Sequence, residues 1–252
     1  MTTVDDEIFQ SAPLEEVAYE VRFPGLFHIY QAIGEFQLEI MDDFPRPSQF
    51  DQVGFAIENL GSGVPKLSTE TSEKPRTCWQ FKSESGRTKV RVKVDSLAII
   101  SNEYKSYDNP GNIMFKDIII KIVSKFLEKI PIKKFSRIGL RYIDHCPLDD
   151  KTNSYFMKYY IPTFDLNKYR IEDSIKSHFV MVTQRDDYNL VFQSGIDKIN
   201  EKYKYVMDFD GSALNIDSSK YSSITDDLHK MLRKEFNSCI TEEFKQYMRG
   251  NK

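Results

Sequence analysis

Cysteine and histidine are scarce in this 252-residue sequence, which contains three cysteines and four histidines. The cysteines lie far apart, at Cys78, Cys146 and Cys239, so they form neither a disulfide framework nor a zinc-binding cluster. We expect them to be free thiols in a reducing compartment, the cytoplasm. No His-Glu-x-x-His pattern occurs, and no second histidine or cysteine lies at metal-ligand spacing. The sequence therefore predicts no metal site.

Long apolar runs and a large excess of charge are also missing. No run approaches the ~20 apolar residues of a membrane-spanning helix, and the acidic first residues lack the apolar region of a signal peptide. We therefore expect a cytoplasmic protein that does not bind membranes. The net charge of -3 excludes a strong overall attraction to nucleic acid, although a local basic patch could still bind it. No cofactor is predicted, because Gly61-Ser62-Gly63 has no lysine following in the register of a phosphate-binding loop.

The apolar content is that of a folded chain. Apolar residues make up 40% of the sequence and aromatic residues 13%, which excludes a disordered protein. The length allows one large domain or two small ones. Residues 1–12 are polar and predict a flexible tail, and we expect a single domain over residues 13–250.

The most regular stretch is Arg137–Asp144, with the sequence Arg-Ile-Gly-Leu-Arg-Tyr-Ile-Asp. Large apolar side chains occupy the even positions from 138 to 142, and arginines occupy the odd positions 137 and 141. Because successive side chains of a strand point to opposite faces, this pattern predicts a strand with one apolar and one cationic face.

Hydrophobic periodicity predicts strands and helices along the rest of the chain. Strands are expected at 17–23, 53–60, 77–83, 87–94, 97–104, 179–184, 188–194 and 203–209. Helices are expected at 26–41, with an apolar stripe of Phe27, Tyr30, Ile33 and Leu38, then from Asn109-Pro110 to Pro131, and at 223–248, where Ser223 and Asp226 resemble a cap. After the first helix, Pro45 and Pro47 predict an extended loop.

The order of these elements repeats. Each half runs strand, long connection, three-strand meander and long helix, over roughly 14–130 and roughly 135–248. We therefore predict an α+β fold of two similar halves, in which one or two antiparallel sheets are covered by two long helices. The segment 147–175 has many tyrosines and no clear period, so it carries no prediction.

Three segments of the chain resemble a family of bacterial proteins. They are Pro13–Phe23 at the start of the domain, the central Arg137–Asp144 motif, and Phe236–Thr241 near the end. The family is uncharacterised, sporadically distributed and of similar length, and the resemblance covers nearly the whole chain. Its patchy occurrence implies a mobile island that carries anti-phage defence or toxin–antitoxin genes. The resemblance brings no catalytic residues, because none are established for the family.

Two local patterns are similar to catalytic motifs. The run Asp208-Phe209-Asp210-Gly211-Ser212 looks like the first motif of haloacid-dehalogenase-type phosphatases, where the first aspartate is the nucleophile. That fold needs a doubly wound parallel sheet and further residues downstream, so we interpret the run as a strand that ends in an acidic turn. Asp144-His145-Cys146 alternate between the two faces of a strand and cannot form a triad together. No catalytic residue is predicted.

Cationic side chains recur on the polar faces of the predicted strands, and Glu20 shares such a face with Arg22. The candidate ligand-binding residues are Arg22, Arg91, Lys93, Arg137 and Arg141. If these strands are neighbours, the face is either a solvated surface with cross-strand pairs, such as Arg141 with Glu20, or a basic surface for a nucleotide, polyphosphate or RNA.

The absence of a catalytic set, the 14 tyrosines and the family's distribution favour a non-enzymatic binding protein, an adaptor or a sensor. We expect it to act through a protein partner, either the product of a neighbouring gene or a second copy in a homodimer. The alternative is a protein that binds nucleotides, polyphosphate or RNA on the arginine-bearing face, with or without enzymatic activity.

Overall fold

The computed structural model describes residues 9, 11–52, 76–104, 107 and 114–250, and these form an α+β fold around one antiparallel sheet. The sheet has nine strands in the order β2-β3-β4-β5-β1-β6-β9-β8-β7. The strands are β1 (Leu14–Arg22), β2 (Arg46–Gln52), β3 (Arg76–Lys82), β4 (Thr88–Lys93), β5 (Ser96–Ser101), β6 (Lys134–Pro147), β7 (Phe179–Arg185), β8 (Tyr188–Ile199) and β9 (Lys202–Asp217). The helices are α1 (Ile29–Ile40), α2 (Phe115–Lys129), α3 (Asn153–Tyr159), α4 (Tyr221–Ser238) and α5 (Glu242–Met248), with a 3-10 turn, η2 (Ser218–Lys220), before α4.

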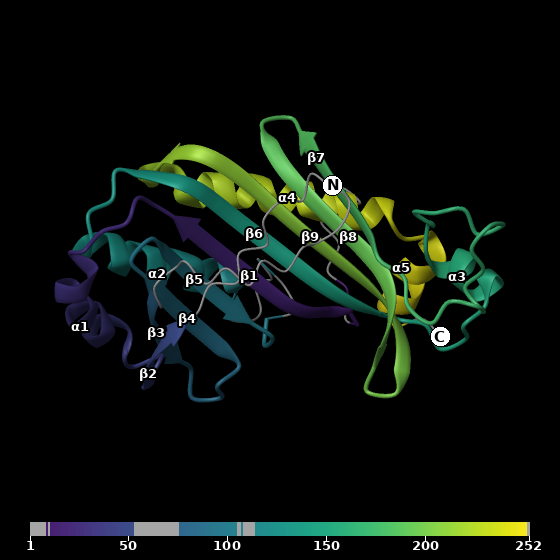
Figure 1. Ribbon diagram of the computed structural model, residues 1–252, viewed down its shortest axis with the longest axis horizontal. Coiled ribbons are helices and arrows are strands. Elements are labelled where there is room, and N and C mark those ends of the chain that lie inside the picture. The colour runs from purple at the N-terminus through teal and green to yellow at the C-terminus, as the bar shows by residue number, and fades with distance from the viewer. Residues whose placement is uncertain (1–8, 10, 53–75, 105–106, 108–113, 251–252) are drawn as a thin grey trace.

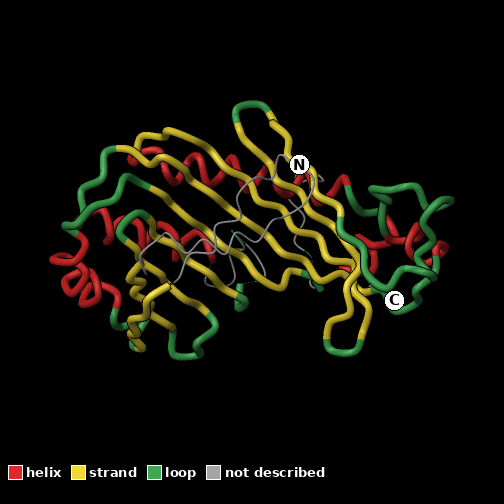
Figure 2. The backbone as a smooth tube through the Cα atoms, viewed as in Figure 1, coloured by secondary structure: helices red, strands yellow, loops and turns green. Residues whose placement is uncertain are grey.

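Helices cover one face of the sheet, and we call the opposite face the open face. Figure 1 shows α4 behind β6 and β9, with α3 and α5 gathered at one end of the molecule and α1 at the other, and Figure 2 shows the sheet running between them. The core lies between the sheet and the helices, where Leu140 of β6 and Ile122 of α2 belong to one buried cluster. No helix among the described residues is both long and apolar enough to cross a lipid bilayer.

The alternating patterns predicted strands well. β1 and β6 are both present, and the predicted hairpin at Ser85-Gly86 joins β3 to β4. β6, β8 and β9 each extend beyond the predicted bounds. The strand expected at 53–60, the loop after it, the start of the second helix at Asn109-Pro110 and most of the tail 1–12 lie outside the described residues.

Most of the apolar stripe predicted for the first helix is exposed, and of its four residues only Ile33 is partly buried against the core. Phe27 and Leu38 are 87% and 68% exposed, whereas Phe36 and Ile40 are fully buried. Phe36 packs edge-on against Phe81 of β3 and Phe126 of α2, with ring centroids 6.0 and 5.4 Å apart. The buried residues of α1, which include Phe36 and Ile40, form a second stripe at helical spacing. The position of α2 and β3 therefore decides which of the two stripes is buried.

The segment with two prolines is a strand rather than the predicted loop. Arg46–Gln52 forms β2, which pairs with β3 along its whole length. Because Pro47 has no N–H to donate, proline is tolerated in a sheet on an edge strand. β2 is the edge of this sheet.

The single C-terminal helix predicted at 223–248 is two helices. α4 ends at Ser238, and Thr241 caps α5 by accepting a hydrogen bond from the Phe244 amide at 3.3 Å. The break at Ile240 pairs with Tyr160 at the end of α3, so backbone hydrogen bonds to a distant segment replace those of a continuous helix. The predicted cap at Ser223 and Asp226 is wrong as well, since both residues lie inside α4.

Candidate functional site

The five candidate ligand-binding residues all lie on the open face. Arg91 on β4 pairs with Ala98 on β5, which in turn pairs with Glu20 on β1. In the same way, Lys93 pairs with Ser96, which pairs with Arg22. Arg22 in turn is opposite Arg137, and Arg141 is opposite Ala18 on β1. The predicted charged surface therefore exists as one continuous face from β4 to β6.

Arg137 bridges two carboxylates. Its guanidinium donates to Glu20 on β1 at 3.3 Å and to Asp210 on β9 at 2.6 Å. The side chain lies directly over Gly139, where a Cβ atom would be 2.1 Å from Nη1. The glycine of the central motif thus gives Arg137 the space to reach both neighbouring strands.

Arg141 binds Asp208 and not Glu20. Its Nε and Nη2 donate to the two oxygens of Asp208 at 2.8 and 2.5 Å, a bidentate pair. Asp208 and Asp210 lie within β9, two residues apart on the open face, so the predicted acidic turn is wrong. Burial raises the pKa of Asp210, while the charges of Arg137 and Arg141 oppose this shift.

Arg22 and Arg91 also have polar partners. Arg22 donates to Glu20 at 2.7 Å, and Arg91 donates to Gln80 at 2.9 Å. Lys93 forms no ion pair with any residue that the structure describes. At the centre of the open face, the arginine charges are thus balanced by carboxylates of the same chain.

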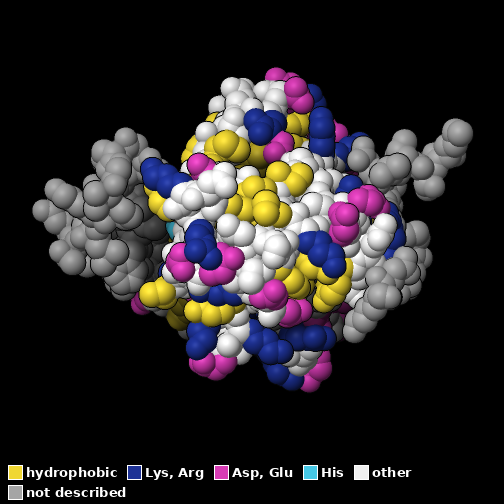
Figure 3. Space-filling model, turned by 90° about the vertical axis from the view of Figure 1, so that its right-hand side faces the viewer, with side chains coloured by type: hydrophobic (Ala, Val, Ile, Leu, Met, Phe, Trp, Pro, Cys, Tyr) yellow, Lys and Arg dark blue, Asp and Glu magenta, His cyan; other side chains and the backbone are white. Residues whose placement is uncertain are grey.

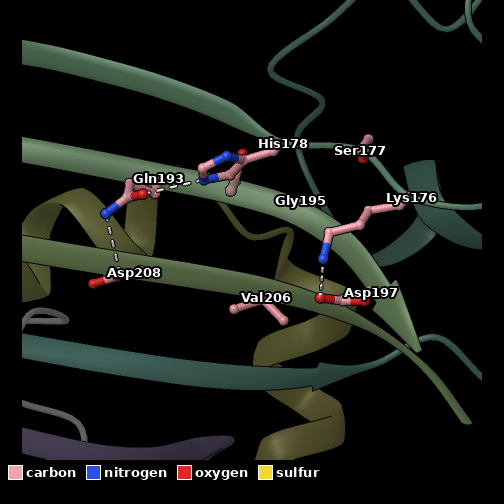
Figure 4. Close-up of a pocket in the computed structure, with 9 residues that line it drawn as sticks. Lys176, Ser177, His178, Gln193, Gly195, Asp197, Val206 and Asp208 are labelled. Atoms are coloured by element: carbon pink, nitrogen blue, oxygen red, sulfur yellow. Dashed lines mark hydrogen bonds and ion pairs between the residues drawn. The ribbon is translucent and has the colours of Figure 1, made fainter. Parts of the chain in front are cut away.

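A pocket of about 230 Å³ lies on the open face next to this ion-pair network (Figure 4). Part of its lining is the segment 176–178, which passes over β8 just before β7 begins. Within the lining, Lys176 is paired with Asp197 at 2.9 Å. Its lining residues are Lys176, Ser177, His178, Gln193, Ser194, Gly195, Asp197, Val206 and Asp208.

A hydrogen-bond chain links the pocket to the arginines. Nε2 of His178 lies 3.1 Å from Oε1 of Gln193, and the Gln193 amide donates to Asp208 at 3.3 Å. Asp208 then accepts from Arg141. We did not predict His178 or Gln193 from the sequence. The period-two spacing of Asp208 and Asp210 was the available sign that these carboxylates share one face of a strand.

The described residues form neither a metal site nor an activated thiol. No three His, Cys, Asp or Glu side chains of the described segments are grouped to hold a metal ion. Burial raises the pKa of Cys146 well above its usual value, and the charge of Asp144 adds to the shift. A thiol in this environment is a poor nucleophile, because the thiolate is the reactive form.

Replacing Arg141 with lysine is expected to lower the free energy of unfolding by about 1 kcal/mol, because lysine keeps the charge at a side chain that is 42% exposed but cannot make both hydrogen bonds to Asp208. Arg137→Lys is expected to cost more, by roughly 1 kcal/mol for each hydrogen bond that lysine does not replace, because Arg137 is 19% exposed and touches two carboxylates. Urea unfolding of both variants measures the difference. A polyanion site would be shown by a thermal-shift assay in which nucleotides stabilise the wild type but not the folded Arg141→Lys variant.

No known family model matches the chain, and no curated protein matches it. The resemblance to a bacterial family therefore stays an expectation.

Proposed function

We propose that this protein is a non-enzymatic binding module that acts through a protein partner, whose extended segment adds to β7 as a further strand of the sheet. Strand addition of this kind gives affinity through main-chain hydrogen bonds and selects partners through alternate side chains. A cytoplasmic location and a role in an anti-phage defence or toxin–antitoxin locus are further parts of the proposal, supported by the composition and by the family resemblance.

The observation that carries the proposal is the character of the edge strand β7. β7 pairs with β8 along one side only, and its other edge forms no backbone hydrogen bond within the described segments. From Val180 to Gln184 it contains no charged residue and no proline. Val180 and Val182 are 38% and 62% exposed on the open face. An unpaired edge with exposed apolar side chains and no charge at its centre is a template for pairing with another chain.

The opposite edge strand carries a proline, which β7 lacks, whereas both edge strands have an ion-paired arginine at one end. β2 contains Pro47, which cannot donate to an added strand, and Arg46, which is bound to Glu84 at 2.8 Å. Natural sheets use proline and charge in this way to prevent association at their edges. The contrast between the two edges supports a binding role for β7.

We also propose that the two predicted halves correspond to β1–α2 and β6–α4. In each half, the central strand pairs with the last strand of a meander, β1 with β5 and β6 with β9. β7 then corresponds to β3, and β3 carries β2 as its outer neighbour. The duplication therefore supports an additional strand at the position beside β7.

The charge distribution favours this function over polyanion binding. Arg137 and Arg141 are bound to Glu20, Asp208 and Asp210, so their charges are compensated within the chain. The end of the molecule that carries α3 and α5 mixes both signs of charge with apolar side chains (Figure 3). Polyanion binding depends on clustered cations without such compensation.

Val182→Lys is expected to abolish partner binding, because it places a charge on the edge that an incoming strand would cover. We would express a tagged copy with untagged products of the neighbouring genes and an untagged copy of the same chain, and quantify what co-purifies. The matched control is Leu38→Lys, an exposed leucine on α1. Circular dichroism verifies that both variants fold. If Val182→Lys retains every partner of the wild type, or the wild type retains none, the proposed function is wrong.

A further inference from the structure

We infer that the strand added to β7 is the β7 of a second copy of this chain, paired antiparallel about a twofold axis through Val182. This inference rests on the proposed function and names its partner. Closed twofold dimers are the commonest oligomers, and each copy contributes the same surface to the interface. The resulting sheet would continue from one copy into the other.

The length and composition of β7 favour one register. The strand has seven residues, so pairing about its middle residue, Val182, uses its full length. In this register Val182 is opposite Val182 of the second copy, and Val180 is opposite Gln184. Exposed β-branched side chains would then contact each other across the axis on the open face, the kind of pair that stabilises neighbouring strands.

The charges of β7 are compatible with self-pairing. Arg185 is the strand's only charged residue, and the twofold places it opposite Phe179 of the second copy rather than opposite itself. Its guanidinium is already bound to Glu235 of α4 at 2.7 Å. Like charges directly opposite each other would destabilise an antiparallel pair, and this register contains none.

The twofold axis would be perpendicular to the sheet, so the open faces of both copies would lie on one side and both α4 helices on the other. The pocket beside the segment 176–178 lies on the open face of β8 and β9, so the pockets of both copies would lie on the same side of the joined sheet.

The first measurement is the mass in solution by light scattering coupled to size exclusion. The wild type and Leu38→Lys are expected at twice the chain mass of 29.5 kDa, and Val182→Lys at the chain mass itself, because two lysines would meet on the axis. A monomeric wild type at high micromolar concentration would overturn the inference. If Val182→Lys still lost a neighbouring gene product in the co-purification, strand addition would stand with a different partner.

Cysteine cross-linking tests the register. Residues opposite each other in an antiparallel pair have Cα atoms about 4.5–5.5 Å apart, which is within disulfide reach. Val182→Cys is therefore expected to form a covalent dimer with itself under diamide oxidation. Val180→Cys is not expected to do so, because its copies lie four residues apart along the strands, about 13 Å.

A mixture of Val180→Cys and Gln184→Cys should cross-link, because these positions are opposite each other in the inferred register. The wild type, which contains Cys78, Cys146 and Cys239, controls for the native thiols. Dimers cross-linked equally well by Val180→Cys alone and by Val182→Cys would show that the two strands do not pair about Val182.

Discussion

Leu140→Ala is expected to lower the free energy of unfolding by about 2–5 kcal/mol, the usual cost of removing a buried leucine side chain. Leu140 is 0% exposed on the helix-covered face of β6. Its neighbours across the sheet are Tyr19 on β1 and Gly211 on β9, the strands on either side of β6. The strands on both sides are fixed by their own pairing, so the cavity cannot collapse fully.

Urea unfolding, with the midpoint and slope fitted together, measures this cost. Leu38→Ala is the matched control, because Leu38 is exposed on α1 and its truncation should change stability by no more than about 0.5 kcal/mol. Equal midpoints for the two variants would mean that Leu140 does not face the core.

Gly195→Ala is expected to destabilise the protein by about 1–3 kcal/mol, the usual cost of overpacking. A Cβ atom at Gly195 would lie 2.1 Å from the carbonyl oxygen of Ser177. Ser177 cannot move away easily, because its amide donates to Ile196 O at 3.1 Å and its hydroxyl accepts from the Ile196 amide at 3.0 Å. The methyl group would therefore have to push the segment 176–178 away from β8.

The control for this variant is the same substitution at Gly34. A Cβ atom there has nothing within 4 Å, and alanine favours a helix interior by about 0.5–1 kcal/mol over glycine. Gly34→Ala should therefore raise the urea midpoint while Gly195→Ala lowers it. Changes of the same sign and size would contradict the close approach of Ser177 to β8.

Hydrophobic alternation predicted the strands because it depends only on residues that are adjacent in the sequence. Alternation within β1 and β6 specifies which side chains face the core whatever the partner strand, since the period of two is a property of the extended backbone. The turn at Ser85-Gly86 likewise joins β3 and β4, adjacent in both sequence and space.

The errors occurred where a distant segment decided between local alternatives. α1 has two apolar stripes, and the one with Phe36 is buried because α2 lies against it. The C-terminal pattern is continuous to Tyr247, but the pairing of Ile240 with Tyr160 interrupts the helix. Propensity is a weak preference that such tertiary contacts override.

By itself, the sequence determined that this is an α+β protein in which a central strand carries Arg137 and Arg141 on its polar face. Only the tertiary structure decided that these arginines bind Asp210 and Asp208, which are 73 and 67 residues away along the chain. It also decided that β7 forms an edge of the sheet. The register between β6 and β9 brings the arginines and the carboxylates onto the same face of the sheet. A slip of one residue would move the carboxylates to the other face.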